Sequence, residues 1–196
     1  MQRFHAAITA ISLWFARAGG FMLLAAALII TFEIAARKLF LLPFNVGTEL
    51  STYALATGAS WSFSYALLRR AHVRVDVLRK PFPPAGRCLL DILALLSLTA
   101  LAFVLSYFAW QTAATSWIFE ARENTPLATP LAIPQGLWFL GISWFALVAA
   151  EQSVMAVLAF ARGHVAEAIR IAGPVGVAEE LEEVSSSSIL LNQTRK

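Results

Sequence analysis

The sequence contains few of the groups on which catalysis or metal binding usually depends. Its single cysteine, Cys88, cannot form an intramolecular disulfide, and its three histidines, His5, His72 and His164, lack the spacing of a metal site. A nucleophile needs a base within reach, and the sequence shows no serine or cysteine paired with a histidine. We therefore expect no enzyme activity, no catalytic residues, no metal site and no cofactor in this chain.

Charge is scarce as well. Only 14% of the 196 residues are charged and 59% are hydrophobic, with a mean hydropathy of +0.69. A soluble domain is about 25% charged and about 45–50% apolar, so this composition predicts an integral membrane protein. The net charge of +3 argues against nucleic acid as a partner, although the sequence pI is about 9.4.

Four long apolar segments organise the chain, and links that carry proline or glycine separate them. The segments cover residues 18–40, 49–68, 88–110 and 136–160. Each reaches the length of about 20 residues that a helix needs to cross a bilayer. The first is longer than the apolar run of about 7–15 residues in a cleavable signal peptide, so we interpret it as an uncleaved anchor, with a cleaved signal as the alternative. The sequence thus predicts an all-α protein whose membrane domain, residues 1–163, has four transmembrane helices.

The C-terminal part, residues 164–196, has no long apolar run. It ends in the acidic and serine-rich sequence "EELEEVSSSSILLNQTRK". Segments of this composition bury too little apolar surface to fold alone, so we expect a disordered tail.

The cations are unevenly distributed between the two sides of the predicted membrane domain. Four spans place both termini and the second link on one side. That side carries ten cations and the other side three, which predicts cytoplasmic termini by the positive-inside rule. The ten are Arg3, Arg17, Arg69, Arg70, Arg74, Arg79, Lys80, Arg87, Arg162 and Arg170, and the three are Arg37, Lys38 and Arg122.

The second link has an order that charge counting alone does not explain. In "HVRVDVL" three valines alternate with His72, Arg74 and Asp76. A period of two is typical of extended chain, so we predict a short interfacial segment between the second and third helices. Its polar edge would contact neighbouring backbone or a partner, and its valines would face the apolar boundary.

This link also carries a family resemblance. The stretch "RRAHVRVDVL" resembles the A-H-hydrophobic-R-V-D signature of the DctQ-like small permease subunits of tripartite ATP-independent periplasmic (TRAP) transporters. The stretch "FEIAARKLFLLPFNVGTELSTY" and the proline-marked entry "NTPLATPLAIPQG" are similar to the family at the first loop and before the fourth helix. The resemblance covers roughly residues 18–160, and the acidic tail departs from it.

The resemblance implies a subunit of a larger machine in the bacterial inner membrane. In such systems a periplasmic solute-binding protein delivers an organic acid, and a large permease subunit moves it across together with sodium. The small subunit widens the static scaffold around the large one. Sodium is therefore expected at the partner subunit and not in this chain.

Glu33 and Arg37 are the charged residues deepest in the first apolar segment. They stand at i,i+4, so each can neutralise the other where a lone charge is costly. The alternative is that Glu33 is the binding carboxylate of an autonomous small proton-coupled multidrug exporter, a class that also has four spans. Those exporters are shorter and lack the signature around His72.

Two more carboxylates are candidates for structural or partner contacts. Glu49 stands in the first turn of the second predicted helix, where the helix dipole favours a negative charge. Glu151 is the one acidic residue of the fourth helix and has no partner near it in sequence. It is expected either to meet a polar group on another helix or subunit or to lie near the cytoplasmic headgroups.

Overall fold

The computed structural model describes residues 2–40, 46–71, 81–125 and 127–173 of the chain. These residues contain no strand, only an isolated bridge between Arg122 and Pro130, so the expected all-α class is confirmed for them. The helices are α1 (Gln2–Phe40), α2 (Gly47–Leu68), α3 (Pro84–Ile118), α4 (Ala132–Ala161) and α5 (Val165–Ala172).

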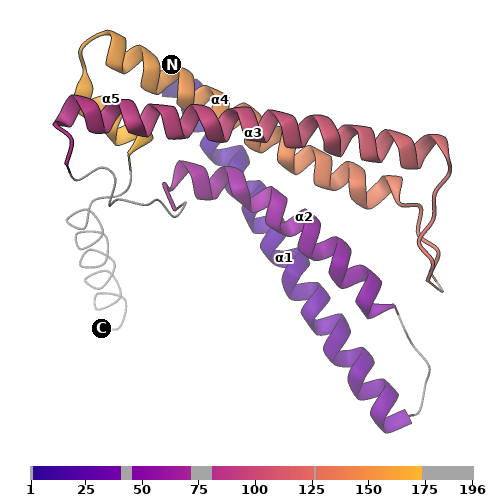
Figure 1. Cartoon of the computed structure of the whole chain (residues 1–196). Helices are drawn as coiled ribbons and strands as arrows, with labels where there is room; N and C mark the ends of the chain where they lie inside the picture. The colour runs from indigo at the N-terminus through magenta and orange to yellow at the C-terminus, as the bar shows by residue number, and fades with distance from the viewer. Residues whose placement is uncertain (1, 41–45, 72–80, 126, 174–196) are drawn as a thin grey trace, which may run out of the picture.

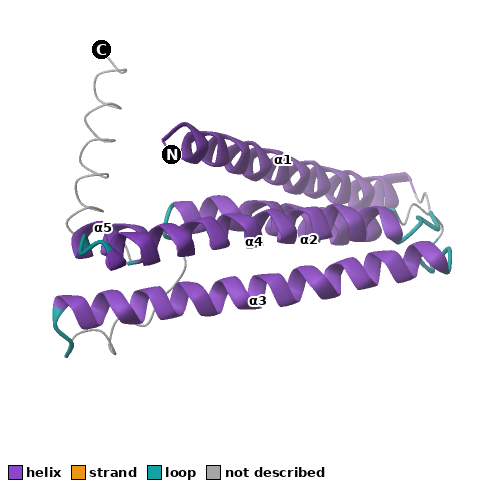
Figure 2. Ribbon diagram, turned by 90° about the horizontal axis from the view of Figure 1, so that it is seen from above, coloured by secondary structure: helices purple, strands orange, loops and turns teal. Residues whose placement is uncertain are grey.

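The four long helices form two antiparallel pairs. Helix α1 packs along α2, and α3 packs along α4, while contacts between α2 and α4 join the two pairs. Figure 1 shows the pairs crossing at an angle. In Figure 2, α1 and α3 are the outer helices, with α2 and α4 between them.

Three of the helices have the length and composition of membrane spans. The apolar stretches are His5–Leu39 in α1, Ala85–Ile118 in α3 and Ala132–Ala161 in α4. The remaining predicted span, residues 49–68, is the second along the chain. It is helical as α2, but among the described residues it does not reach the same average hydropathy. Glu49 and a series of hydroxyl side chains lower its hydropathy. Hydroxyls such as those of Ser60 and Ser62 donate to helix carbonyls of Thr57 and Gly58, at 2.9 and 2.8 Å.

All four long helices extend beyond the apolar segments that predicted them, α1 and α3 by the most. Helix α1 starts sixteen residues before the predicted span 18–40, and α3 continues to Ile118 instead of ending near residue 110. The 39 residues of α1 measure about 58 Å at about 1.5 Å per residue. This is longer than a hydrocarbon core of about 30 Å. Arg17, expected to precede the first span, consequently lies inside the apolar stretch His5–Leu39.

Glycine allows α1 and α4 to approach α2 closely. A Cβ added at Gly19 of α1 would lie 2.8 Å from the backbone oxygen of Gly58 in α2. A Cβ at Gly141 of α4 would lie 2.5 Å from both the Ser60 hydroxyl and a Trp61 ring carbon of α2. Small residues thus set the spacing of α1, α2 and α4, as they do in many membrane helix pairs.

The predicted disordered tail needs a correction at its start. Residues 165–172 form α5, which packs against α3 and α4 with Ala168 and Ala172 fully buried. The eight residues "VAEAIRIA" place their small and branched side chains on one face, a short period that a search for long apolar runs misses. The rest of the predicted tail, from residue 174, lies outside the described residues.

Candidate functional site

Glu33 joins the C-terminal part of α1 to the start of α2. Glu33 is 8% exposed, and Arg37 Nη2 donates to its Oε1 at 2.6 Å, so the predicted i,i+4 pair forms. The backbone N–H of Gly47 donates to the other oxygen, Oε2, at 2.5 Å. Gly47 is the first residue of α2, where backbone N–H groups have no partner within the helix. Glu33 therefore caps α2 from a neighbouring helix, a contact that its sequence position does not reveal.

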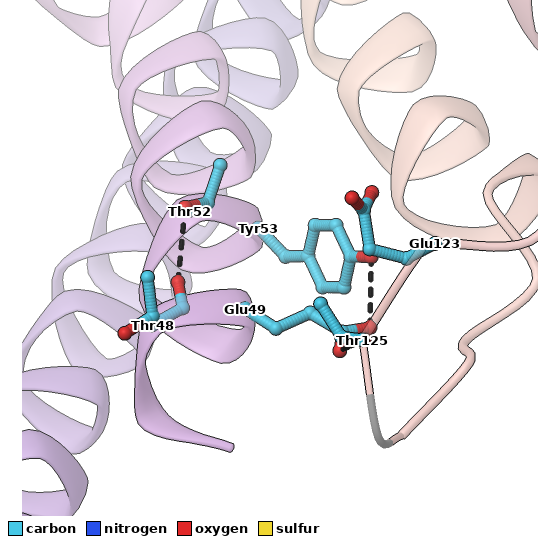
Figure 3. Close-up of a pocket in the computed structure, with 6 residues that line it drawn as sticks. All are labelled: Thr48, Glu49, Thr52, Tyr53, Glu123 and Thr125. Carbon is cyan, nitrogen blue, oxygen red and sulfur yellow. Dashed lines mark hydrogen bonds between the residues drawn. The ribbon is translucent and has the colours of Figure 1, made fainter. Parts of the chain in front are cut away.

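Glu49 joins the first turn of α2 to the connection between α3 and α4. Its carboxylate is buried, and the Tyr53 hydroxyl donates to Oε1 at 2.9 Å. The hydroxyl of Thr125 donates to Oε2. Figure 3 shows Glu49 and Tyr53 reaching from α2 toward this connection. The predicted helix position of Glu49 is correct, but its carboxylate accepts hydrogen bonds from side chains, one of them Thr125, which is 76 residues away in the sequence.

A small pocket lies beside Glu49. Its volume is about 250 Å³, and it is lined by Thr48, Glu49, Thr52, Tyr53, Glu123 and Thr125. Thr52 donates to the carbonyl of Thr48 at 3.0 Å, so its hydroxyl is already satisfied by its own helix. The hydrogen bonds of Glu49 hold α2 to the 119–131 connection, and this gives the carboxylate a structural task.

Glu151 of α4 contacts the first turns of α1. Its Oε1 lies 3.2 Å from His5 Nδ1, and Gln152 Nε2 donates to its Oε2 at 2.7 Å. The partner on another helix that the sequence left open is therefore His5. A second pocket of about 560 Å³ lies next to this contact. Its lining includes His5, Arg70, Gln152, Glu167 and Arg170, from the ends of α1 and α2, from α4 and from α5.

The predicted interfacial segment lies outside the part of the chain that the structure describes. His72, Arg74 and Asp76 lie outside the described residues, so the extended segment and its polar edge stay predictions. Among the residues that the structure describes, no group of three or more His, Cys, Asp or Glu side chains is arranged to hold a metal ion.

Hydrogen bonds between helices, which the sequence did not predict, add to these contacts. Trp144 Nε1 of α4 donates to the Ser12 hydroxyl of α1 at 3.0 Å, and the hydroxyls of Thr99 and Ser153 lie 2.8 Å apart between α3 and α4. Trp61 Nε1 of α2 donates to the Leu137 carbonyl of α4 at 2.9 Å. Such polar groups pair across helices because bare hydrocarbon offers them no partner. Their types were visible in the sequence, but their partners depend on the fold.

A comparison with known protein families identifies the chain. Residues 26–159 match the family described as tripartite ATP-independent periplasmic transporters, DctQ component. The chain belongs to this family. The match contains Glu33, Arg37, Glu49 and Glu151, as well as the signature around His72 that carried the resemblance. No curated protein and no solved structure matched the chain.

Membership assigns a broad role to the DctQ component. It is a membrane component of a TRAP transporter and not an enzyme. A tripartite transporter implies two further components, a large permease and a solute-binding protein. The match gives no support to the alternative of an autonomous proton-coupled exporter that uses Glu33. The pairing of Glu33 with Arg37 and Gly47 agrees with a structural carboxylate.

Proposed function

We propose that this DctQ component scaffolds the large permease subunit of a TRAP transporter for sodium-coupled uptake of an organic acid. A periplasmic binding protein would deliver the carboxylate solute, and sodium would bind at the large subunit. The chain would cross the bacterial inner membrane four times with both termini in the cytoplasm. The family match over residues 26–159 is the observation that carries this proposal.

The hydrogen bonds of the two buried carboxylates, Glu33 and Glu49, support a scaffolding role for the chain. Glu33 accepts hydrogen bonds from Arg37 and Gly47, and Glu49 accepts them from Tyr53 and Thr125. A solute or ion site within a membrane protein needs polar groups that are free to bind its cargo. Here both carboxylates are engaged by groups of this chain, so they fit a rigid support better than a transport pathway.

Reconstitution of the transporter tests the proposal. Vesicles would contain the large subunit with or without this chain, and uptake of a labelled carboxylate would be measured with the binding protein under an inward sodium gradient. Uptake should require the chain, and the large subunit should copurify with it. Equal uptake without the chain would contradict the scaffold role, and uptake that ignores the sodium gradient would contradict the coupling.

A further inference from the structure

Arg17 is a cation inside an apolar helix. It is the only charged residue between His5 and Glu33, and it lies within the apolar stretch His5–Leu39. The residues before it do not leave the helix bundle, because Ile8 and Ser12 are buried and Ser12 accepts a hydrogen bond from Trp144 of α4. The helix before Arg17 is thus packed in the bundle, so Arg17 does not mark the start of the apolar span.

Contacts with α2 set the level of Arg17 in the molecule. Two residues further along α1, Gly19 meets Gly58, which lies roughly halfway along the 22 residues of α2. Two residues before it, the ring of Phe15 lies 4.8 Å from that of Trp61. If α2 spans the bilayer, Arg17 lies near mid-depth, about 15 Å from either headgroup layer of a core of about 30 Å. This is farther than one side chain can reach to place its charge in water.

Arg17 projects from the outer face of α1, which we define as Arg17, Phe21, Leu24, Leu28 and Phe32. Their spacing of three or four residues puts them within about 80° of one another on the helix. Phe21 and Phe32 are each 72% exposed, and Arg17 is exposed as well. Within the part of the chain that the structure describes, Arg17 forms no hydrogen bond or ion pair.

The opposite outer helix offers a contrasting surface. Helix α3 also exposes large apolar side chains, among them Phe108, which is 59% exposed. No charged residue lies between Asp91 and the end of α3 at Ile118. A surface of this kind suits lipid tails, whereas a bare arginine at mid-depth does not, because charges inside membranes face protein or water and pair with one another.

We propose that the outer face of α1 docks the large permease component, and that this partner places an acidic side chain against Arg17. The proposal rests on the proposed function and names the surface that carries it. Charge complementarity selects the partner: the face needs an apolar surface with one anion at mid-depth. A membrane subunit of the same transporter can provide both, and lipid tails provide no anion.

Site-specific crosslinking tests the location of the face. A photoreactive benzoylphenylalanine would replace Phe21 on α1 or, as the matched control, Phe108 on α3, in the complete transporter. We expect an adduct with the large subunit from position 21 and none from position 108. An adduct only from position 108, no adduct from position 21, or an adduct of two copies of this chain would overturn the proposal.

Variants of Arg17 test the charge. Arg17→Leu should leave the amount of this chain in the membrane unchanged, since leucine suits hydrocarbon, and should lower copurification of the large subunit about tenfold, in line with the loss of a charged hydrogen bond. Arg17→Lys keeps the positive charge and should restore part of the copurification of the large subunit. Full copurification with Arg17→Leu would contradict the acidic contact. If even the unmodified chain fails to copurify with a large subunit, the proposed function itself fails, so the two failures are distinguishable.

Discussion

At the scale of single residues, the buried carboxylates act as joints between segments that are distant in sequence. Glu33 receives one donor from its own helix, Arg37, and one from the start of α2, Gly47. A buried carboxylate without donors would be costly, and so would an unpaired N–H at the start of α2. The Glu33 carboxylate therefore pairs with the charge of Arg37 and accepts a hydrogen bond from the N–H of Gly47 at the same end of the α1–α2 pair.

Replacing Glu33 by Gln should destabilise this joint. Glutamine keeps an acceptor for Gly47 but leaves the guanidinium of Arg37 without its counter-charge. The apparent stability of the protein in detergent should fall by about 1–2 kcal/mol, the range of polar contacts between membrane helices, and abundance should fall with it. A thermal unfolding curve measures this, with Lys38→Gln as a control that removes an exposed neighbouring charge.

An unchanged unfolding curve for Glu33→Gln would contradict the structural role. Normal abundance and assembly together with a loss of the pH dependence of transport would instead indicate proton coupling at Glu33.

Thr125→Val tests the second joint. The change removes the hydroxyl that donates to Glu49 and preserves the shape of the side chain, so the connection of residues 119–131 should loosen. Limited proteolysis should cut this connection faster in the variant. Thr52→Val is the matched control, because the Thr52 hydroxyl lines the same pocket but, within the described part of the chain, donates to the Thr48 carbonyl of its own helix. Equal cutting of both variants would show that Glu49 does not hold the connection.

Sequence spacing predicted the pair of Glu33 with Arg37 and the place of Glu49 at a helix start, and it missed the distant partners of both carboxylates. The pair of Glu33 with Arg37 follows from one helical turn, and Glu49 follows from its place at a helix start. The hydrogen bond of Glu33 with Gly47 joins residues 14 apart in sequence, and that of Glu49 with Thr125 joins residues 76 apart. Both form because α2 packs against α1 and against the α3–α4 connection. Tertiary packing fixes such partners, so no local pattern encodes them.

At the scale of helices, glycine decides how closely α1 and α2 pack. Gly19 and Gly58 face each other, and a Cβ on either residue would lie within 3.0 Å of the other residue's backbone oxygen. Backbone cannot swing aside as a flexible side chain does. A larger residue at this crossing must separate the two helices along their length.

Gly58→Ala should therefore destabilise the pair, although alanine is the better helix former. The matched control is Gly20→Ala, because no atom lies within 4 Å of a Cβ at Gly20. That control should be neutral or gain up to about 1 kcal/mol from helix propensity. Thermal unfolding of the two variants in the same detergent checks the contrast. A Gly58→Ala protein as stable as the Gly20→Ala protein would contradict the close crossing.

The existence of the helices was predictable, whereas their ends were not. Long apolar runs predicted α1, α3 and α4, but the runs were cut at charges such as Arg17, and the backbone continues its hydrogen bonds past them. Helix α2 was predicted nearly to its ends, since Gly47 and Arg69 bracket it. The short α5 depends on its contacts with α3 and α4, so composition alone assigned it to a disordered tail.

At the scale of the whole molecule, the fold gathers its charged segments at its two ends. The start of α1, the end of α2 and α5 meet around the pocket whose lining includes His5, Arg70, Glu167 and Arg170. The opposite ends of α1, α2 and α3 also carry charges of both signs, namely Glu33, Arg37, Lys38, Glu49, Arg122 and Glu123. The packing thus brings together segments whose cations were assigned to one side of the membrane from sequence alone.

The distribution of cations predicts a topology that can be measured. Arg17 lies inside the apolar stretch of α1, and without it the predicted inner side still carries nine cations against three on the outer side. Residue 75 and the C-terminus should therefore be cytoplasmic, and residues 45 and 125 should be periplasmic. Alkaline phosphatase fused after residue 45 or 125 should be active, since it folds only in the periplasm, and a fluorescent protein fused after residue 75 or at the C-terminus should mature in the cytoplasm. Active phosphatase after residue 75 would overturn the orientation. Equal reporter behaviour at residues 45 and 75 would show that α2 does not cross the bilayer. The chain would then have three spans instead of four.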